Sequence, residues 1–370
     1  MPLSAAINKD GAKFDYEDSG APPGSSTYTT LVILHGGYFT NGVFRRMIPF
    51  AAASDVRLVL LNARDFGKST PFNEAEMKAI TSKDKESQAS FMRGAAPEYA
   101  AFIAWFVQHE KIPPVKVDRS GRKTGGVGLI GWSGASDWFI PMFAFASEIP
   151  EQTQNVVGEY LRTYVMYDPT YYAIGRDDPP VYCPLRDPAL TPQQQAEAFP
   201  AWVSGYYPDH KPVVRAAFDA MSLDAFPSSE EFFKGIQNER DPSEKFTPTL
   251  LRMSPEELAQ ASDVEVFVRS TLPVLFFDKS FYAECAHKLV FDEAHAKQCF
   301  PKTTVRLVIN MLGQGDCMAC AYFVKEMLLK REASGSGGRP MDVIPFEGVN
   351  HMPHWDYPEK TVKFFASIVQ

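Results

Sequence analysis

The stretch GWSGAS places the hydroxyl of Ser133 between small residues, directly after a short apolar run from Val127 to Ile130. A strand followed by Gly-x-Ser-x-small and a helical pattern is typical of a nucleophile elbow, a sharp turn that presents a serine side chain. Residues two positions away on either side must be small, and Gly131 and Ala135 meet this need, although the final position is usually Gly. We predict that Ser133 is a nucleophile; the alternative is an ordinary glycine-rich turn.

A second glycine motif, HGG at His35–Gly37, ends an apolar run near the start of the sequence. Attack by a serine puts negative charge on a carbonyl oxygen, and backbone N–H groups are suitable donors to that oxygen. We predict that Gly37, Tyr38 and Gly134 form such an oxyanion hole, with His35 in a structural role. The alternative is a glycine-rich strand end without a catalytic part.

A serine hydroxyl is a weak nucleophile at neutral pH and needs a general base within hydrogen-bond reach. The segment GVNHMPHWDYP places His351 in a loop directly after an apolar run, and His354 three residues later. We predict that His351 is the base and keep His354 as the alternative. The other histidines outside the HGG motif are expected at the surface or in packing: His109, His210, His287 and His295.

A carboxylate must hold the tautomer of the base and stabilise its charged form. Asp316 ends the apolar run that precedes the run leading to His351, and Asp168 ends the run before that. Because neighbouring parallel strands end at the same edge of a sheet, we favour Asp316 and keep Asp168 as the alternative. Asp278 is a more remote candidate, and a residue such as Asp168 before Pro169 could simply close a turn.

Strand-like apolar runs alternate with helical patterns along most of the chain, which predicts an α/β fold with a mainly parallel central sheet flanked by helices. The predicted strands lie within residues 28–37, 56–70, 125–134, 162–170, 303–316 and 341–348. Residues 176–265 break this rhythm, because they are rich in Pro, Tyr, Phe and Asp and hold helical pieces without a convincing strand. We predict a core of residues 1–175 and 266–370, with residues 176–265 inserted as a mostly helical cap.

The chain resembles α/β-hydrolases, and in detail a group of fungal capped serine α/β-hydrolases of mostly unassigned function. The residues that carry the resemblance are LHGGYFTNGVFRRMIPFAA, RLVLLNARDFGKSTPF, GWSGAS, YVMYDPTYYAIG and GVNHMPHWDYPEKTVKFF, which are spread over nearly the whole chain. The order nucleophile, acid, histidine is also that of α/β-hydrolases. The resemblance implies the α/β-hydrolase fold and a serine hydrolase with a cap, and it names no substrate.

We therefore expect an enzyme that cleaves an ester, lactone or thioester of a small, apolar or aromatic molecule through an acyl-Ser133 intermediate. The alternatives are a lyase, isomerase or acyltransferase on the same fold, or a receptor that binds a small molecule without catalysis. We expect side chains near the cap to line the substrate pocket: Trp132, Tyr171, Tyr172, Tyr206, Tyr207 and His354.

Composition narrows the partners of the chain. The 370 residues are 45% hydrophobic and 22% charged, with a formal net charge of −8, and no Lys/Arg cluster suggests a nucleic-acid face. No apolar run is long enough to span a membrane. The five cysteines are too sparse for a disulfide framework, and CMAC at 317–320 lacks a second pair of metal ligands. We expect a cytoplasmic protein without a metal or cofactor; the sequence does not predict its oligomeric state.

Overall fold

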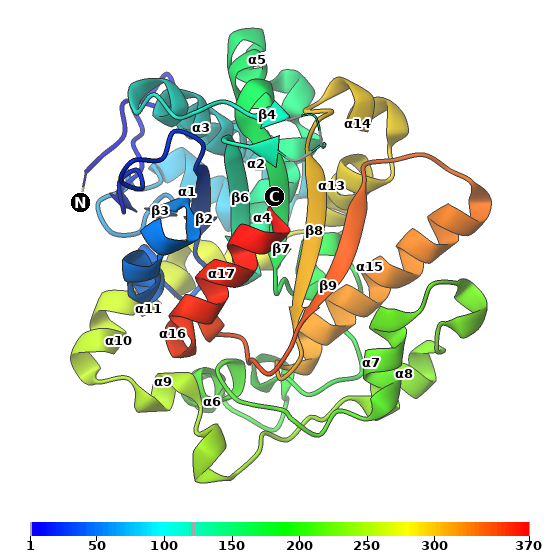
Figure 1. The fold of residues 1–370 in the computed structure, drawn as a ribbon. Helices are drawn as coiled ribbons and strands as arrows, with labels where there is room; N and C mark the ends of the chain where they lie inside the picture. The colour runs from blue at the N-terminus through cyan, green and yellow to red at the C-terminus, as the bar shows by residue number, and fades with distance from the viewer. Residues whose placement is uncertain (1, 118, 120, 122, 370) are drawn as a thin grey trace.

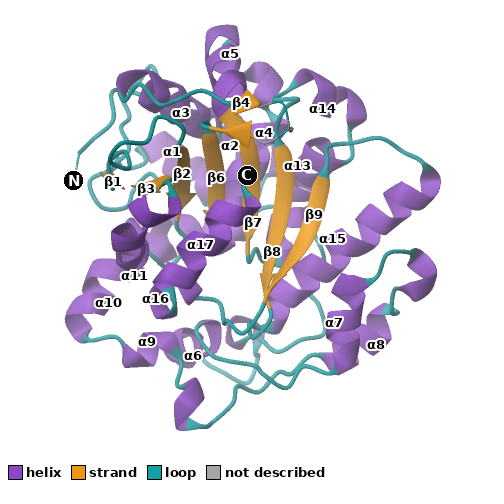
Figure 2. Cartoon of the chain, in the orientation of Figure 1, coloured by secondary structure: helices purple, strands orange, loops and turns teal. Residues whose placement is uncertain are grey.

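A computed structural model describes residues 2–117, 119, 121 and 123–369. Seven strands form one sheet in the order β1-β3-β2-β6-β7-β8-β9. Their bounds are β1 Tyr16–Asp18, β2 Thr29–Leu34, β3 Val56–Leu61, β6 Val127–Trp132, β7 Leu161–Tyr167, β8 Thr304–Asn310 and β9 Met341–Phe346. Only β1 pairs antiparallel within this sheet, so the mainly parallel sheet predicted from the apolar runs is confirmed (Figures 1 and 2).

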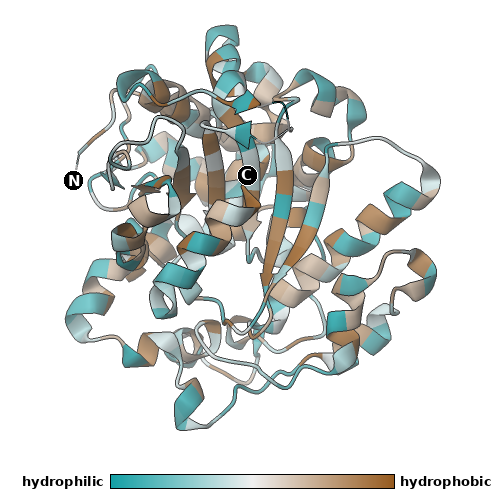
Figure 3. Cartoon of the chain, viewed as in Figure 1, coloured by the Kyte–Doolittle hydropathy of each residue, from teal (hydrophilic) through white to brown (hydrophobic). Residues whose placement is uncertain are grey.

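Both faces of the sheet are covered. Alternate residues of each strand point to opposite sides, and the apolar side chains on each side are buried. In β2, Leu31 and Ile33 belong to one apolar cluster, while Val32 and Leu34 belong to the other. Figure 1 shows α17 (Pro358–Ile368) in front of the sheet, with α4 (Ser136–Ala144) and α13 (Lys279–Val290) behind it. Figure 3 shows mostly apolar residues in β6, while β8 and β9 near the sheet edge also carry hydrophilic ones.

The other helices of the core follow the strands or lead into them. They are α1 Glu74–Ile80, α2 Lys85–Ala95, α3 Pro97–His109, α5 Glu151–Tyr160, α14 Glu293–Gln298, α15 Gly315–Ser334 and α16 Pro353–Asp356. A ten-residue 3₁₀ segment, Asn41–Phe50, follows β2 and packs against α17. A separate two-stranded ribbon joins β4 (Lys116–Val117) to β5 (Lys123–Thr124).

The segment between β7 and β8 is helical and holds no strand among its described residues. Its helices before α13 are α6 Pro192–Val203, α7 Pro212–Asp219, α8 Ser229–Gly235, α9 Thr249–Arg252, α10 Pro255–Ala261, α11 Val264–Val266 and α12 Leu272–Leu275. A π-helical turn, Phe267–Thr271, joins α11 to α12. The helical character predicted for residues 176–265 is confirmed, while their separation as a cap stays a prediction.

The strand order reverses next to β2, whose neighbours are β3 on one side and β6 on the other. In open α/β sheets such a reversal opens a crevice at the carboxyl ends of the strands, where ligands bind. The HGG motif follows β2 and Ser133 follows β6, so the two predicted motifs meet at this crevice.

In the part of the chain that the structure describes, no helix combines the length and apolarity needed to cross a bilayer.

Candidate active site

Ser133 lies in a sharp turn between β6 and α4. Its φ of 52° is in the left-handed region, which few residues other than glycine adopt. The turn needs a small residue at Gly131, because a β-carbon there would approach the ring of Phe139 to 2.9 Å. The predicted elbow geometry is therefore present, and strained backbone of this kind is common at functional sites.

The turn after β2 lies against the Ser133 turn. A β-carbon on Gly36 would come within 3.0 Å of the Ser133 β-carbon, and one on Gly134 would lie 3.3 Å from the backbone nitrogen of Gly37. The N–H groups of Gly37 and Gly134 therefore lie close together beside Ser133. The insertion holds this turn in place, since Asp263 N donates to Tyr38 O at 3.2 Å.

His35 is a buried brace of the glycine turn. Its Nε2 accepts a hydrogen bond from Ala63 N at 3.1 Å, so the proton is on Nδ1, which donates to Gly36 O at 2.8 Å. Burial lowers the pKa of His35 from 6.5 to about 4, which keeps the ring neutral near pH 7. This geometry agrees with a structural role.

His351 donates from Nδ1 to Oδ2 of Asp168 at 2.6 Å, with both side chains buried. The carboxylate can only accept, which leaves Nε2 of His351 free to take a proton. Asp168 has a φ of 48°, and its other oxygen accepts from Asn310 N at 3.0 Å. Ser133 and His351 line one cavity, and no hydrogen bond between their side chains is present among the described residues. Such contacts are often long before substrate binds.

The expectation that Asp316 holds the base is wrong, because His351 is paired with Asp168 instead. The loop after β9 does not stop beside β8 but runs over the end of that strand, where Leu312 N donates to Val349 O at 2.8 Å. The indole of Trp132 then donates to His351 O at 3.1 Å and fixes the loop beside β6. His351 therefore lies over the end of β7, which is the strand that leads into Asp168.

Asp316 is instead the second residue of α15, and Arg186 of the insertion binds both of its oxygens at 2.8 Å. Burial raises the pKa of the Asp316 carboxyl, while Arg186 opposes that rise. Arg186 also donates to the hydroxyls of Tyr171 and Tyr172, at 2.9 and 3.1 Å. Asp316 thus belongs to an ion pair that ties the insertion to α15.

The cavity at Ser133 is small, with a volume of about 60 Å³. Ser133, Gly134, Gly37, Tyr38 and His351 form its reactive side. Its other walls are mainly apolar, formed by Phe39, Leu185, Phe199, Trp202, Val203, Phe267, Leu272, Leu275 and Phe276. Its polar lining residues are Thr170, Tyr172, Cys183, Gln314 and Asp316. Small-molecule pockets usually measure about 300–1,000 Å³, so this cavity is much smaller than a typical substrate site.

Of the six predicted pocket residues, the structure places only Tyr172 on this cavity. Trp132 is fully buried, and its ring packs against those of His351 and His354. Tyr171 donates to Asp178, and Tyr206 donates to Asp356. The hydrogen-bond partners of these two tyrosines could not be predicted from the aromatic runs in which they lie.

The two remaining predicted pocket residues also lie elsewhere. Tyr207 lines a separate pocket of the insertion and donates to Trp202 O at 2.9 Å. His354 is buried behind Trp132, next to the hydroxyl of Tyr167 at 3.3 Å. Burial, helped by the neighbouring His351, holds the pKa of His354 well below its ordinary value. Its burial and its place away from the cavity argue against His354 as the base.

Cys317 was missed as a neighbour of the site. Its thiol donates to Asp168 O at 3.2 Å and lies 3.9 Å from His351 Nδ1. One atom each of Asp168, Cys317 and His351 could serve as a metal ligand within 4.8 Å of the others. However, burial and the charge of Asp168 raise the pKa of the thiol well above its ordinary value, and metals bind the thiolate. His351 Nδ1 is also occupied by Asp168. The three residues therefore suit a network of hydrogen bonds better than a metal site.

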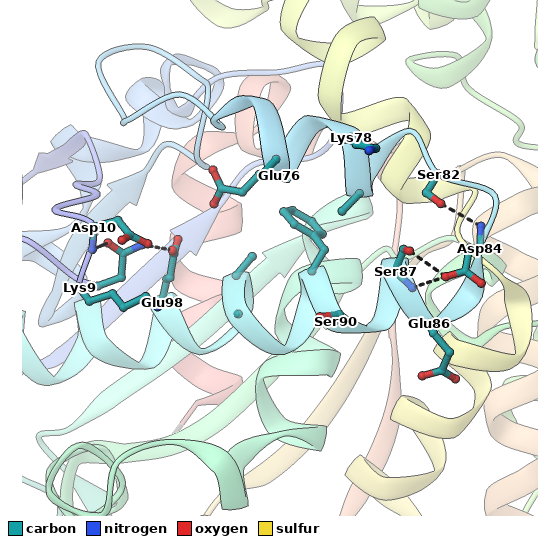
Figure 4. Close-up of a pocket in the computed structure, with 16 residues that line it drawn as sticks. Lys9, Asp10, Glu76, Lys78, Ser82, Asp84, Glu86, Ser87, Ser90 and Glu98 are labelled. Carbon is teal, nitrogen blue, oxygen red and sulfur yellow. Dashed lines mark hydrogen bonds between the residues drawn. The ribbon is translucent and has the colours of Figure 1, made fainter.

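A larger groove of about 750 Å³ lies away from Ser133, between the N-terminal segment and α1, α2 and α3. Figure 4 shows Glu76, Asp84 and Glu98 along it. Asp84 accepts from Ser87 at the start of α2, and Arg64 holds Glu98 at 3.0 Å. These carboxylates have structural partners, and the groove brings together no nucleophile and base among the residues described.

No family model and no curated protein sequence matches the chain. Similar solved structures include an esterase from Exiguobacterium antarcticum, with 14% identity, a TM-score of 0.45 and coverage of 99% of this chain and 98% of that one. A lipase-esterase related protein from Clostridium acetobutylicum has 10% identity, a TM-score of 0.44 and coverage of 96% and 98%. A bromoperoxidase from Bacillus anthracis has 11% identity, a TM-score of 0.40 and coverage of 100% and 98%.

At these identities and TM-scores the likenesses assign no activity, and the narrower resemblance to fungal proteins stays a prediction. The chain's own strand order, its parallel sheet and the turn at Ser133 identify its architecture. The chain has the α/β-hydrolase fold.

Proposed function

We propose that this chain is a serine hydrolase that cleaves an ester, lactone or thioester of a small molecule through an acyl-Ser133 intermediate. One observation carries the proposal: His351 donates to Asp168 at 2.6 Å while its other nitrogen is free, in the cavity that also exposes Ser133. Asp168 takes the role of the acid, in place of the Asp316 expected from the sequence.

In the first half of the reaction, Ser133 Oγ attacks the acyl carbon and His351 Nε2 accepts the hydroxyl proton. Asp168 keeps the Nδ1 proton in place and stabilises the charged ring. The backbone N–H groups of Gly37 and Gly134, with Tyr38 as a further candidate, stabilise the negative oxygen. The bond to the leaving group then breaks, and that group takes the proton from Nε2.

In the second half, water attacks the acyl carbon and gives one proton to Nε2. The bond to Ser133 Oγ breaks, and the proton returns to Oγ as the acid is released. Substrate binds in an apolar cavity, which favours an apolar or aromatic acyl or alcohol group. In this proposal residues 176–265 act as a cap, and the helical residues 267–275 continue the cover over Ser133.

Labelling with a fluorophosphonate probe tests the nucleophile, and release of p-nitrophenol from p-nitrophenyl acetate tests the reaction. We expect the wild-type protein to be labelled at Ser133, as mapped by mass spectrometry, and to hydrolyse the ester. Ser133→Ala should show neither behaviour. Absence of labelling at Ser133, or equal turnover by Ser133→Ala, would overturn the proposal. Labelling at Ser133 together with product formation that needs an acceptor other than water would indicate an acyltransferase.

A further inference from the structure

The insertion carries a second pocket that the reaction at Ser133 does not by itself explain. Its volume is about 720 Å³, against about 60 Å³ for the cavity at Ser133. Only the larger volume falls in the range of about 300–1,000 Å³ that is usual for small-molecule sites. Trp202 lines both spaces and is itself only 8% exposed.

Residues 182–184 lie in the wall between the two spaces, because Cys183 lines the cavity at Ser133 while its two neighbours line the outer pocket. Cys183 has extended backbone, with φ −144° and ψ 126°, so successive side chains point to opposite sides. Cys183 faces the cavity at Ser133, while Tyr182 and Pro184 line the outer pocket.

The rest of the wall is the last turn and a half of α6. Phe199 and Val203 face the cavity at Ser133, whereas Ala198 and Ala201 face the outer pocket. The two alanines leave the outer side of the helix open. Among the described residues of α6, Trp202 is the large side chain that contributes to both sides.

We propose that the outer pocket is a second substrate subsite, and that Trp202 is the specificity-determining residue that separates it from the reacting centre. This inference rests on the proposed hydrolysis at Ser133. In this proposal the Trp202 side chain, which lines both spaces, moves aside to join them, so that the ester group reacts in the inner cavity and the far end of the substrate lies in the outer pocket.

The lining of the outer pocket indicates the chemistry of that far end. Tyr182 offers most of the aromatic surface, since the other two aromatic lining residues, Trp202 and Tyr207, are only 8% and 1% exposed, and Pro184 and Pro242 add rigid apolar surface. Exposed polar residues at the rim, Asn238, Glu239 and Arg240, leave room for a polar tip in contact with water. The substrate class is therefore an ester with an extended apolar or aromatic group.

Filling the outer pocket tests this inference without touching the inner cavity. Ala198→Phe adds a ring to the outer face of α6, and Ala196→Phe makes the same change at an exposed position of that helix that lines neither space. The readout is the ratio of kcat/KM for p-nitrophenyl octanoate and 4-phenylbutyrate to that for p-nitrophenyl acetate. We expect Ala198→Phe to lower this ratio about tenfold, as loss of apolar pocket contacts does, and Ala196→Phe to leave it unchanged.

Opening the wall should have the opposite effect. Trp202→Ala should raise the ratio for the long esters, and Trp202→Phe should raise it less. Phe276→Ala is the comparison, because Phe276 is a half-exposed residue in another wall of the inner cavity. An unchanged ratio in Ala198→Phe, or a rise in Phe276→Ala that Trp202→Ala does not match, would overturn the inference. If Trp202→Ala does not fold, Ala198→Phe decides.

These outcomes separate the two proposals. Hydrolysis of p-nitrophenyl acetate by the wild-type protein, with a ratio that Ala198→Phe does not change, removes only the outer subsite. Absence of both hydrolysis and fluorophosphonate labelling removes the proposed function and the subsite with it.

Discussion

Two residues of the candidate site, Ser133 and Asp168, hold left-handed backbone that ordinary side chains avoid. Such conformations cost about 1–3 kcal/mol each and persist where the surrounding structure imposes them. Here the turn after β6 presents the Ser133 side chain to the cavity, and the turn after β7 presents the Asp168 carboxylate to His351. Strained backbone at two neighbouring strand ends supports a functional role more strongly than either turn alone.

The choice between the two carboxylates can be tested directly. Asp168→Asn should lower kcat by up to about 10⁴-fold, because an amide can bind the unwanted tautomer of His351. Asp316→Asn should lower it far less, since Asp316 contacts Arg186 rather than His351. Steady-state kinetics on a reactive ester, with unfolding curves for both variants, measure the difference. A larger loss in Asp316→Asn would return the acid to the position favoured by the sequence.

Ser133 and His351 should behave as a unit. Ser133→Ala and His351→Ala should each lower kcat by about 10⁴ to 10⁶, and the double variant should be scarcely worse. His354→Gln serves as the comparison, because its buried ring lies behind Trp132 and outside the cavity. Losses that add up in the double variant, or a larger loss in His354→Gln than in His351→Ala, would contradict the assignment.

At the scale of elements, the contact between Arg186 and Asp316 joins the insertion to α15. Arg186→Met should lower the free energy of unfolding by about 3–5 kcal/mol, because it leaves a buried carboxylate without its partner. The double variant Arg186→Met/Asp316→Leu should recover much of that loss, since no charge is left unpaired. Urea unfolding of the three proteins gives the comparison. A double variant no more stable than Arg186→Met would mean that the pair does more than neutralise charge.

The strands, the elbow and the helical insertion follow from the sequence because local patterns determine them. The apolar runs of β2, β6, β7 and β8 are long enough to read, whereas β1 has three residues and escaped prediction. The sequence favoured the wrong acid, Asp316, because the path of the loop from Val349 to His351 depends on the indole of Trp132, far away in sequence. The positions of the aromatic residues could not be predicted either, since they depend on partners far away in sequence, such as Asp356 for Tyr206.

For the whole molecule, buried ionisable groups make stability depend on pH. The pKa of His35 is about 4 when folded against 6.5 as its ordinary value, so the unfolded chain binds the extra proton first. Its contribution is complete above about pH 6.5 and is lost as the pH falls toward 4. Asp137 acts in the opposite sense, because burial raises its pKa and its contribution is lost as the pH rises. Comparing the wild-type protein with a His35 variant isolates the contribution of this histidine from those of such opposing groups.

His35→Gln should therefore flatten the acid side of the stability curve. Between pH 7 and pH 5 the wild-type protein should lose about 2 kcal/mol more unfolding free energy than the variant, given about 1.4 kcal/mol per unit of pKa difference. Urea unfolding at both pH values measures this difference. Equal losses in the two proteins would show that His35 does not titrate as its burial requires.

The contact between His351 and Asp168 joins residues 183 positions apart, with β8 and β9 added to the sheet edge between them. Contacts of such long sequence separation form late in folding, because the chain must first lose the entropy of closing a large loop before the contact contributes favourable free energy. During folding, Ser133 and its turn can form while the base is still absent. Reactivity toward a fluorophosphonate should therefore appear only after the sheet is complete. The time at which Ser133 becomes reactive during refolding then reports the final stage of folding.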